Sequence, residues 1–115
     1  MPLIKLQTTV PLSDEKQQEL LASLSRLIAG AIGKPERYVM ATLSPTAIVM
    51  SGQTGPAAFA DVRSIGGLNP QVNQQIARQL CQLLTLTLRI PPERVYLNFT
   101  DVPPGNWGWN SQTFG

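Results

Sequence analysis

The sequence predicts an α+β fold in which two helices cover one face of a single sheet. Three observations support it: strands of alternating apolar residues, two amphipathic helices, and a Pro-Glu-Arg tripeptide found at Pro35–Arg37 and again at Pro92–Arg94. The repeat suggests two βαβ units, at about residues 1–50 and 57–109, packed as a two-layer sandwich. At 115 residues the chain is expected to form one domain.

The first unit opens with a predicted strand followed by a predicted helix. Apolar and polar residues alternate over Leu3–Val10, which is typical of a strand. Ser13 can cap the helix that follows, and Gly33 can end it. The apolar stripe of this helix recurs every three or four residues, at Leu20, Leu24, Leu27 and Ile28. Two more strands are expected at Tyr38–Ser44 and at Ala47–Met50.

The second unit is predicted to follow the same order. A strand is expected at Phe59–Ile65, a helix at about Pro70–Leu88, and a last strand at Val95–Asp101. Asn69 directly before the helix is a good N-terminal cap, and a proline suits the first helical position. Parallel strands joined by a helical crossover are implied within each unit.

Two further predictions concern packing. Shifted by the spacing of the tripeptide, Cys81 falls on Leu24 of the first helix, which predicts a small core residue instead of a reactive thiol. The sheet face away from the helices keeps apolar and aromatic side chains that nothing in one chain covers, among them Tyr38, Met40, Phe59 and Ile65. Oligomerisation is the expected remedy.

The composition argues against several classes of function. With one cysteine and no histidine, the chain cannot form an internal disulfide, a thiolate zinc site, or a Ser-His or Cys-His nucleophile pair. The net charge of +2 and scattered basic residues give little support to nucleic-acid binding. No apolar run approaches the ~20 residues of a membrane span, and no signal peptide is recognisable. We expect a cytoplasmic protein, with unconventional secretion left open.

The N-terminus offers a candidate base. Enzymes that remove the initiator methionine normally accept a following proline, and processing would give Pro2 a free secondary amine. An α-amino group titrates near ~8, and burial beside another cation lowers that pKa. A neutral Pro2 could then act as a general base. The alternative is a Met-Pro start with no chemical role, which the dipeptide alone favours.

Short motifs recur along the whole chain in a specific order. They are Met1-Pro2, Val10-Pro11, Gly33-Lys34-Pro35 ahead of Tyr38, Ser64-Ile65-Gly66, Arg89-Ile90-Pro91, Arg94 to Asn98, and Gly108-Trp109-Asn110 with Thr113-Phe114. Each is ordinary alone. Together and in this order they resemble the macrophage migration inhibitory factor family of the tautomerase superfamily.

The resemblance implies both an assembly and an activity. The assembly is a homotrimer whose three sheets surround a central barrel, with active sites at the subunit interfaces. The activity is keto–enol tautomerisation of phenylpyruvate-like α-keto acids, with Pro2 as the catalytic base. Moving one proton between carbon and oxygen requires a base and a binder for the developing anion, and neither a metal nor a cofactor.

The resemblance also assigns residues around Pro2. Lys34 is implied to pair with the substrate anion, although a lysine after a helix also suits the helix dipole. Ser64 and the backbone N–H of Ile65 are implied to bind the substrate, although the Ile65 side chain could equally belong to the core. The remaining residues implied to line the pocket are aromatic or amide side chains: Tyr96 and Asn98 from the neighbouring subunit, and Tyr38, Trp107, Trp109 and Phe114.

The chain departs from the family pattern at two places. Ala57 and Ala60 stand where mammalian members have a Cys-x-x-Cys motif, so a thiol oxidoreductase activity is not expected. Trp107 replaces a smaller apolar residue, so substrate preference does not transfer. Two other functions stay open: a cytokine-like protein that binds a receptor and keeps an idle pocket, and decarboxylation or dehalogenation of a small acid assisted by Arg63.

Overall fold

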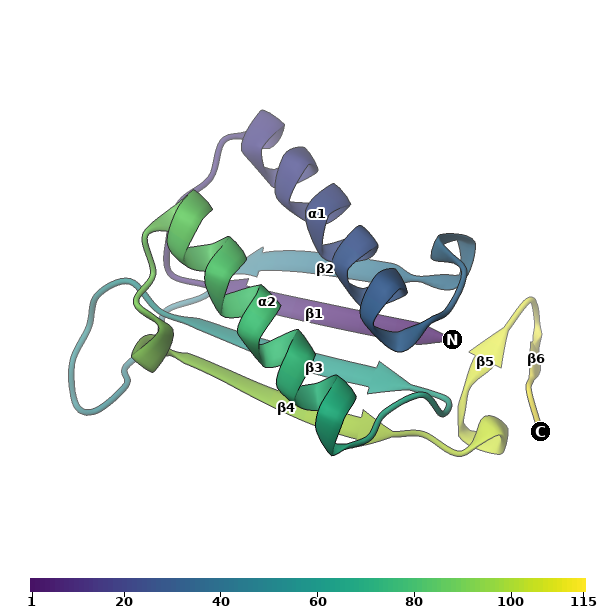
Figure 1. The fold of residues 1–115 in the computed structure, drawn as a ribbon. Helices are drawn as coiled ribbons and strands as arrows, with labels where there is room; N and C mark the ends of the chain where they lie inside the picture. The colour runs from purple at the N-terminus through teal and green to yellow at the C-terminus, as the bar shows by residue number, and fades with distance from the viewer.

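The computed structural model describes all 115 residues. Two helices, α1 and α2, lie on the same face of a four-stranded sheet, and a small hairpin stands beside the end of the sheet where the chain begins (Figure 1). The predicted α+β, two-layer arrangement is confirmed. The elements in chain order are β1 (Pro2–Thr8), α1 (Asp14–Ile32), η1 (Glu36–Tyr38), β2 (Met40–Pro45), β3 (Ala58–Ser64), α2 (Pro70–Leu88), η2 (Pro92–Arg94), β4 (Val95–Asp101), η3 (Pro104–Asn106), β5 (Gly108–Trp109) and β6 (Gln112–Thr113).

The sheet is mixed, with strand order β2-β1-β3-β4. Within each unit the two strands are parallel, because a helix carries the chain back across the sheet between them. The units meet through the antiparallel pair of β1 and β3, in which Pro2 lies opposite Ser64. This register places the start of the chain beside the segment that follows β3.

The helices begin and end where their capping residues predict. Ser13 accepts a hydrogen bond from the Lys16 N–H at 3.3 Å, and Asn69 accepts one from the Val72 N–H at 2.9 Å. Gly33 ends α1 in the left-handed conformation, with φ of 77°. Neither helix is long and apolar enough to cross a membrane.

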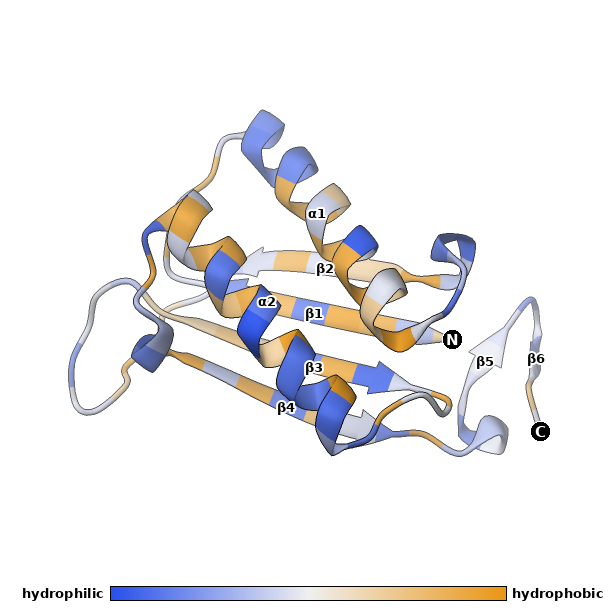
Figure 2. Ribbon diagram, in the orientation of Figure 1, coloured by the Kyte–Doolittle hydropathy of each residue, from blue (hydrophilic) through white to orange (hydrophobic).

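The core lies between the helices and the sheet, and Figure 2 shows apolar stretches of β1 and β3 beneath the two helices. Leu20, Leu24 and Ile28 of α1 are buried as predicted, whereas Leu27 is only partly buried. Together with the apolar residues of α2, the strands and one loop, the buried set that forms the core comprises Ile4, Leu6, Leu20, Leu24, Ile28, Ile32, Ala58, Ala60, Val62, Ile76, Leu80, Leu84, Ile90 and Val95.

The Pro-Glu-Arg tripeptide does not mark structurally equivalent positions. β3 begins 56 residues after β1, and α2 begins 56 residues after α1, whereas the two tripeptides are 57 residues apart. Cys81 therefore corresponds to Ser25 and not to the buried Leu24. Its thiol lies half-buried at the margin of the core, and burial raises the pKa of that thiol. The prediction that Cys81 occupies a core position was wrong by one residue of register.

Two predicted strands also differ from the structure. Ala47–Met50 forms no strand, because Met50 pairs only with Gln53 across a tight turn through Ser51 and Gly52, both at positive φ. Tyr38 belongs to the short helical turn η1, so β2 starts at Met40 instead of Tyr38. The remaining strand boundaries agree with the prediction to within two residues.

The open face of the sheet is more polar than predicted. Strand residues alternate between the two faces, so the positions between the buried ones point away from the helices. Those positions are mostly polar, and Arg63 forms an ion pair with Asp61 there at 3.0 Å. Tyr38 and Ile65, which we expected on this face, lie outside the strands. The outward residues are Leu3, Lys5, Gln7, Met40, Thr42, Ser44, Phe59, Asp61, Arg63, Tyr96, Asn98 and Thr100.

Candidate active site

The pairing of β1 with β3 holds the N-terminus against the loop that follows β3. Pro2 is less than 2% exposed, and the backbone N–H of Ile65 donates to the Met1 carbonyl at 3.3 Å. While Met1 is attached, the Pro2 nitrogen belongs to an amide and has no basic lone pair. Removal of Met1 would create a secondary amine at Pro2 and free the Ile65 N–H at the same place.

Lys34 lies beside the N-terminal amine because of how α1 ends. The left-handed Gly33 turns the chain, and the Lys34 N–H still donates to Ala29 in the last turn at 3.2 Å. Burial, and secondly the positive charge of Lys34, lower the pKa of the Met1 amine below its ordinary value of 8.0. An amine at this point is therefore closer to neutral at physiological pH than an exposed one.

The loop after β3 is tightly packed against the end of α1. Gly67 has φ of +82°, and a Cβ added there would lie 2.6 Å from Ile32 Cγ2 and 3.8 Å from Lys34 Cε. The Gly66 N–H donates to the Asp101 carboxylate at 2.9 Å, which ties the same loop to the end of β4. These contacts fix the position of Ile65 relative to Lys34.

Two depressions flank Met1, and Tyr38 lines both of them. Their volumes are about 450 Å³ and about 670 Å³. Since Met1 lies between them, its removal would join them above Pro2. The smaller depression is lined by Met1, Lys34, Pro35, Tyr38, Ile65, Pro104 and Phe114. The larger is lined by Met1, Pro2, Leu3, Arg37, Tyr38, Val39, Met40, Trp107, Gly108 and Trp109.

A third depression of about 740 Å³ exceeds both in volume, but it lies on α2 around Arg78 and Cys81. Its lining contains neither the N-terminus nor Lys34. We place the candidate site at the N-terminus, because the perturbed amine, the nearby cation and a free backbone donor would meet there.

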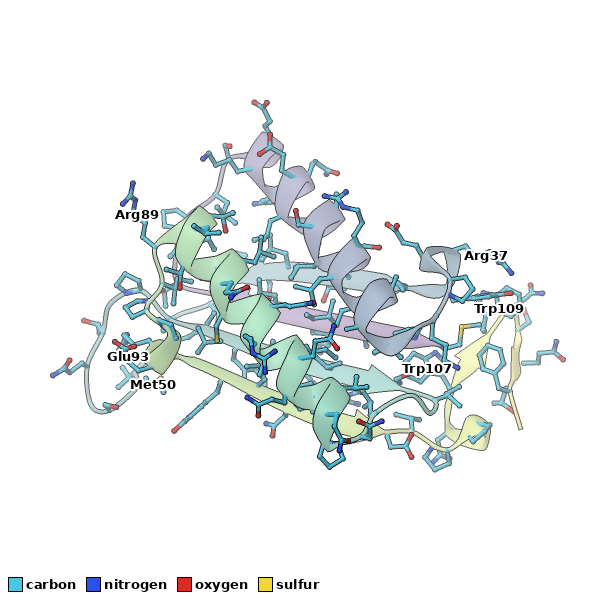
Figure 3. All side chains as sticks on the ribbon, in the orientation of Figure 1. Arg37, Met50, Arg89, Glu93, Trp107 and Trp109 are labelled. Carbon is cyan, nitrogen blue, oxygen red and sulfur yellow. The ribbon has the colours of Figure 1, made fainter.

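The C-terminal segment supplies the aromatic wall. Trp109 and Phe114 stack with ring centroids 5.9 Å apart and planes 12° apart, and the Phe114 N–H donates to the Trp107 carbonyl at 3.2 Å. Figure 3 shows Trp107 and Trp109 at the end of the molecule where Figure 1 places the N-terminus. The four aromatic residues expected around Pro2, including Tyr38, therefore line one or both depressions.

Three of the expected residues are not in the lining. Ser64 is fully buried, and its hydroxyl donates to the Gly66 carbonyl at 2.7 Å, so its side chain supports the loop. Tyr96 and Asn98 lie on the open face of β4, which is separated from β1 by β3. Asn98 is thus about 10 Å from Pro2 across the sheet and about 10 Å along it. In one chain the site forms without Tyr96 and Asn98.

Sequence reasoning missed two features of this region. Arg37 lines the larger depression, with its guanidinium carbon 4.7 Å from the centroid of the Tyr38 ring. Gly67 and Asp101 position the loop that carries Ile65. The Gly66-Gly67 pair is a recognisable turn signal, but the sequence does not indicate which helix the turn approaches.

Comparisons with known proteins agree with this geometry. The profile of the family described as macrophage migration inhibitory factor matches residues 1–115. The macrophage migration inhibitory factor of Xenopus tropicalis is 37% identical over 115 residues, covering 99% of each chain. The crystal structure of a homologue from Prochlorococcus marinus has a TM-score of 0.92 and 39% identity, covering 98% of this chain and 99% of its own.

A further solved structure bears on chemistry. It is of a protein inactivated by 2-oxo-3-pentynoate, an α-keto acid, and is 25% identical with a TM-score of 0.85, covering 96% of this chain and 94% of its own. The resemblance carried by the sequence motifs is thus confirmed over the full length. The chain belongs to the macrophage migration inhibitory factor family, within the tautomerase superfamily.

Proposed function

We propose that the chain, once Met1 is removed, is a keto–enol tautomerase acting on phenylpyruvate-like α-keto acids, with Pro2 as the general base. The observation that carries the proposal is the environment of the N-terminal nitrogen. Burial and Lys34 lower the pKa of the amine at this point, so the neutral, basic form is available near pH 7. The inactivation of a relative by an α-keto acid supports the substrate class.

The proton transfer can be followed in the direction that forms the enol. The neutral Pro2 nitrogen accepts a proton from the carbon next to the keto group, and the electron pair of that C–H bond forms the enol double bond. Negative charge moves to the keto oxygen, where the Ile65 N–H released by Met1 can donate a hydrogen bond. The proton on Pro2 then passes to this oxygen, and the base is neutral again.

Lys34 has two roles in this proposal. It binds the substrate carboxylate, and its charge disfavours the protonated form of the neighbouring amine. The aromatic wall formed by Trp107, Trp109 and Phe114 binds the ring of the substrate. We expect this chemistry to take place in the cytoplasm.

We further infer that the active form is a homotrimer whose sheets surround a central barrel, as the family resemblance implies. Tyr96 and Asn98 of one subunit would complete the site built around Pro2 of the next. Their exposure on the edge strand β4 supports this role, since nothing in their own chain covers them. Mixed oligomers of Pro2→Gly and Asn98→Ala chains test the sharing, because some of their sites would combine an intact Pro2 with an intact Asn98. Activity above the mean of the parents is expected, and activity equal to that mean would contradict it.

The base is tested with the variant Pro2→Gly, in which processing leaves a primary amine at the N-terminus. General acid–base catalysis contributes about 10²–10⁴-fold, so we expect a loss of at least ~10²-fold in kcat/KM for phenylpyruvate. Size-exclusion chromatography with light scattering should show an unchanged oligomer. Unprocessed chains that retain Met1 are the matched control and should also be inactive. A fully active Pro2→Gly variant would rule out the proposed base.

A further inference from the structure

One arginine at the candidate site has no anionic partner. The Arg37 guanidinium lies over the Tyr38 ring, 4.7 Å from its centroid, and Nη2 donates to the Tyr38 hydroxyl at 3.4 Å. The acidic neighbour Glu36 points elsewhere, because its carboxylate accepts a hydrogen bond from the Ser25 hydroxyl at 2.9 Å. The only ion pair in the structure joins Arg63 to Asp61. Arg37 is therefore held over an aromatic ring with donors left free for a ligand.

The lining of the joined site carries two cations and no carboxylate. Lys34 lines the depression on one side of Met1, and Arg37 lines the depression on the other side. Neither lining includes an aspartate or a glutamate, although the chain has seven acidic residues. The carboxylate of a simple α-keto acid would neutralise Lys34 alone, which leaves the charge of Arg37 unmatched.

Between these cations lies a surface suited to a flat ring. Tyr38 lines both depressions, and Trp107 and Trp109 line the depression that contains Arg37. Figure 3 shows Arg37, Trp107 and Trp109 at the same end of the molecule. A substrate whose carboxylate binds Lys34 and whose ring lies along this surface would direct the far side of the ring toward Arg37.

We propose that the preferred substrate is an arylpyruvate with a second anionic group on its ring, a carboxylate or a phosphate, and that Arg37 binds this group. The proposal rests on the tautomerase function proposed above and names its substrate class. Arginine suits the task, because its planar guanidinium forms paired hydrogen bonds with carboxylate and phosphate oxygens.

The test compares substrates that differ at the far end of the ring. The processed protein is assayed for kcat and KM with 4-hydroxyphenylpyruvate, 4-carboxyphenylpyruvate and the phosphate ester of the 4-hydroxy compound. A partly exposed charge pair predicts a preference of about fivefold to tenfold in kcat/KM for at least one dianion, expressed mainly in KM. The preference should fall as ionic strength rises. The carboxylate and phosphate arms identify which anion is favoured.

Two variants assign the preference to Arg37. Arg37→Gln should reduce the ratio of dianion to 4-hydroxy kcat/KM to about one, whereas Arg78→Gln, which removes an equal charge from α2, should leave the ratio unchanged. Equal kcat/KM for all three substrates in the unmodified protein, or a preference that survives Arg37→Gln, would overturn the proposal.

A binding measurement separates this proposal from the proposed function. Tryptophan fluorescence can report binding of 4-carboxyphenylacetate and phenylacetate, neither of which has a keto group. Binding of the dianion several-fold tighter than the monoanion, and lost in Arg37→Gln, is expected even if no substrate is turned over. Turnover of phenylpyruvate without any preference for the dianion, in rate or in binding, would leave the tautomerase and reject the role of Arg37.

Discussion

Gly67 brings the loop after β3 against the end of α1, and its replacement by alanine should destabilise the protein more than the same change at Gly66. Both glycines have left-handed φ, of +82° and +71°. A new Cβ at Gly67 would lie 2.6 Å from Ile32 Cγ2, whereas at Gly66 nothing lies within 4 Å. The pair therefore separates the cost of the backbone conformation from the cost of the contact.

The magnitudes follow from these two terms. Each alanine costs about 1–2 kcal/mol for a left-handed backbone. At Gly67 the buried Ile32 must also shift, and overpacking of this kind costs about 1–3 kcal/mol more. The free energy of unfolding should thus fall by about 2–5 kcal/mol in Gly67→Ala and by about 1–2 kcal/mol in Gly66→Ala.

Urea denaturation followed by tryptophan fluorescence measures both variants, at one protein concentration because an oligomer's stability depends on it. Gly66→Ala keeps the N–H that donates to Asp101, which makes it a fair control. Equal shifts of the two midpoints would show that the approach of Gly67 to Ile32 has no energetic weight. The packing argument for the position of Ile65 would then fail.

Three further predictions concern single side chains. Lys34→Gln should raise the pKa of the Met1 amine in the unprocessed chain, seen as a shift in the pH dependence of its acylation, but not to the ordinary value, because burial is the larger cause; an unchanged profile would contradict the role of Lys34. Asp101→Ala removes the acceptor of the Gly66 N–H and should cost about 1 kcal/mol in urea denaturation, while Asp101→Asn should cost less; equal losses would dismiss the hydrogen bond. The Cys81 thiol, whose pKa is raised by burial, should react with iodoacetamide more slowly in the native than in the urea-unfolded protein, and equal rates would show that it is accessible.

Local signals made the helices the most predictable part of the fold. Asn69 and Pro70 mark the start of α2, and Ser13 and Gly33 mark the limits of α1, because capping depends on neighbours in sequence. The Ala47–Met50 run has the apolar character of a strand, but a strand also needs a partner, and this run pairs only through Met50 within its own turn. Pairing is a tertiary property that composition does not reveal.

The candidate site was predictable in part for the same reason. The order of short motifs indicated Pro2, Lys34 and the aromatic residues, and the structure brings these to one end of the sheet. The unmatched charge of Arg37 could not be recognised in the sequence, where Glu36 is its neighbour. Only the hydrogen bond of Glu36 to Ser25 on α1 makes clear that the two charges do not pair.

The most direct test of the central proposal combines two measurements on one sample. The intact mass of the purified protein shows whether Met1 has been removed, and the ketonisation rate of enol-phenylpyruvate is then followed across pH. For the processed protein we expect turnover that declines as pH falls through a pKa below that of an ordinary amine, ~8. A processed protein with no turnover would contradict the proposal and favour the receptor-binding alternative.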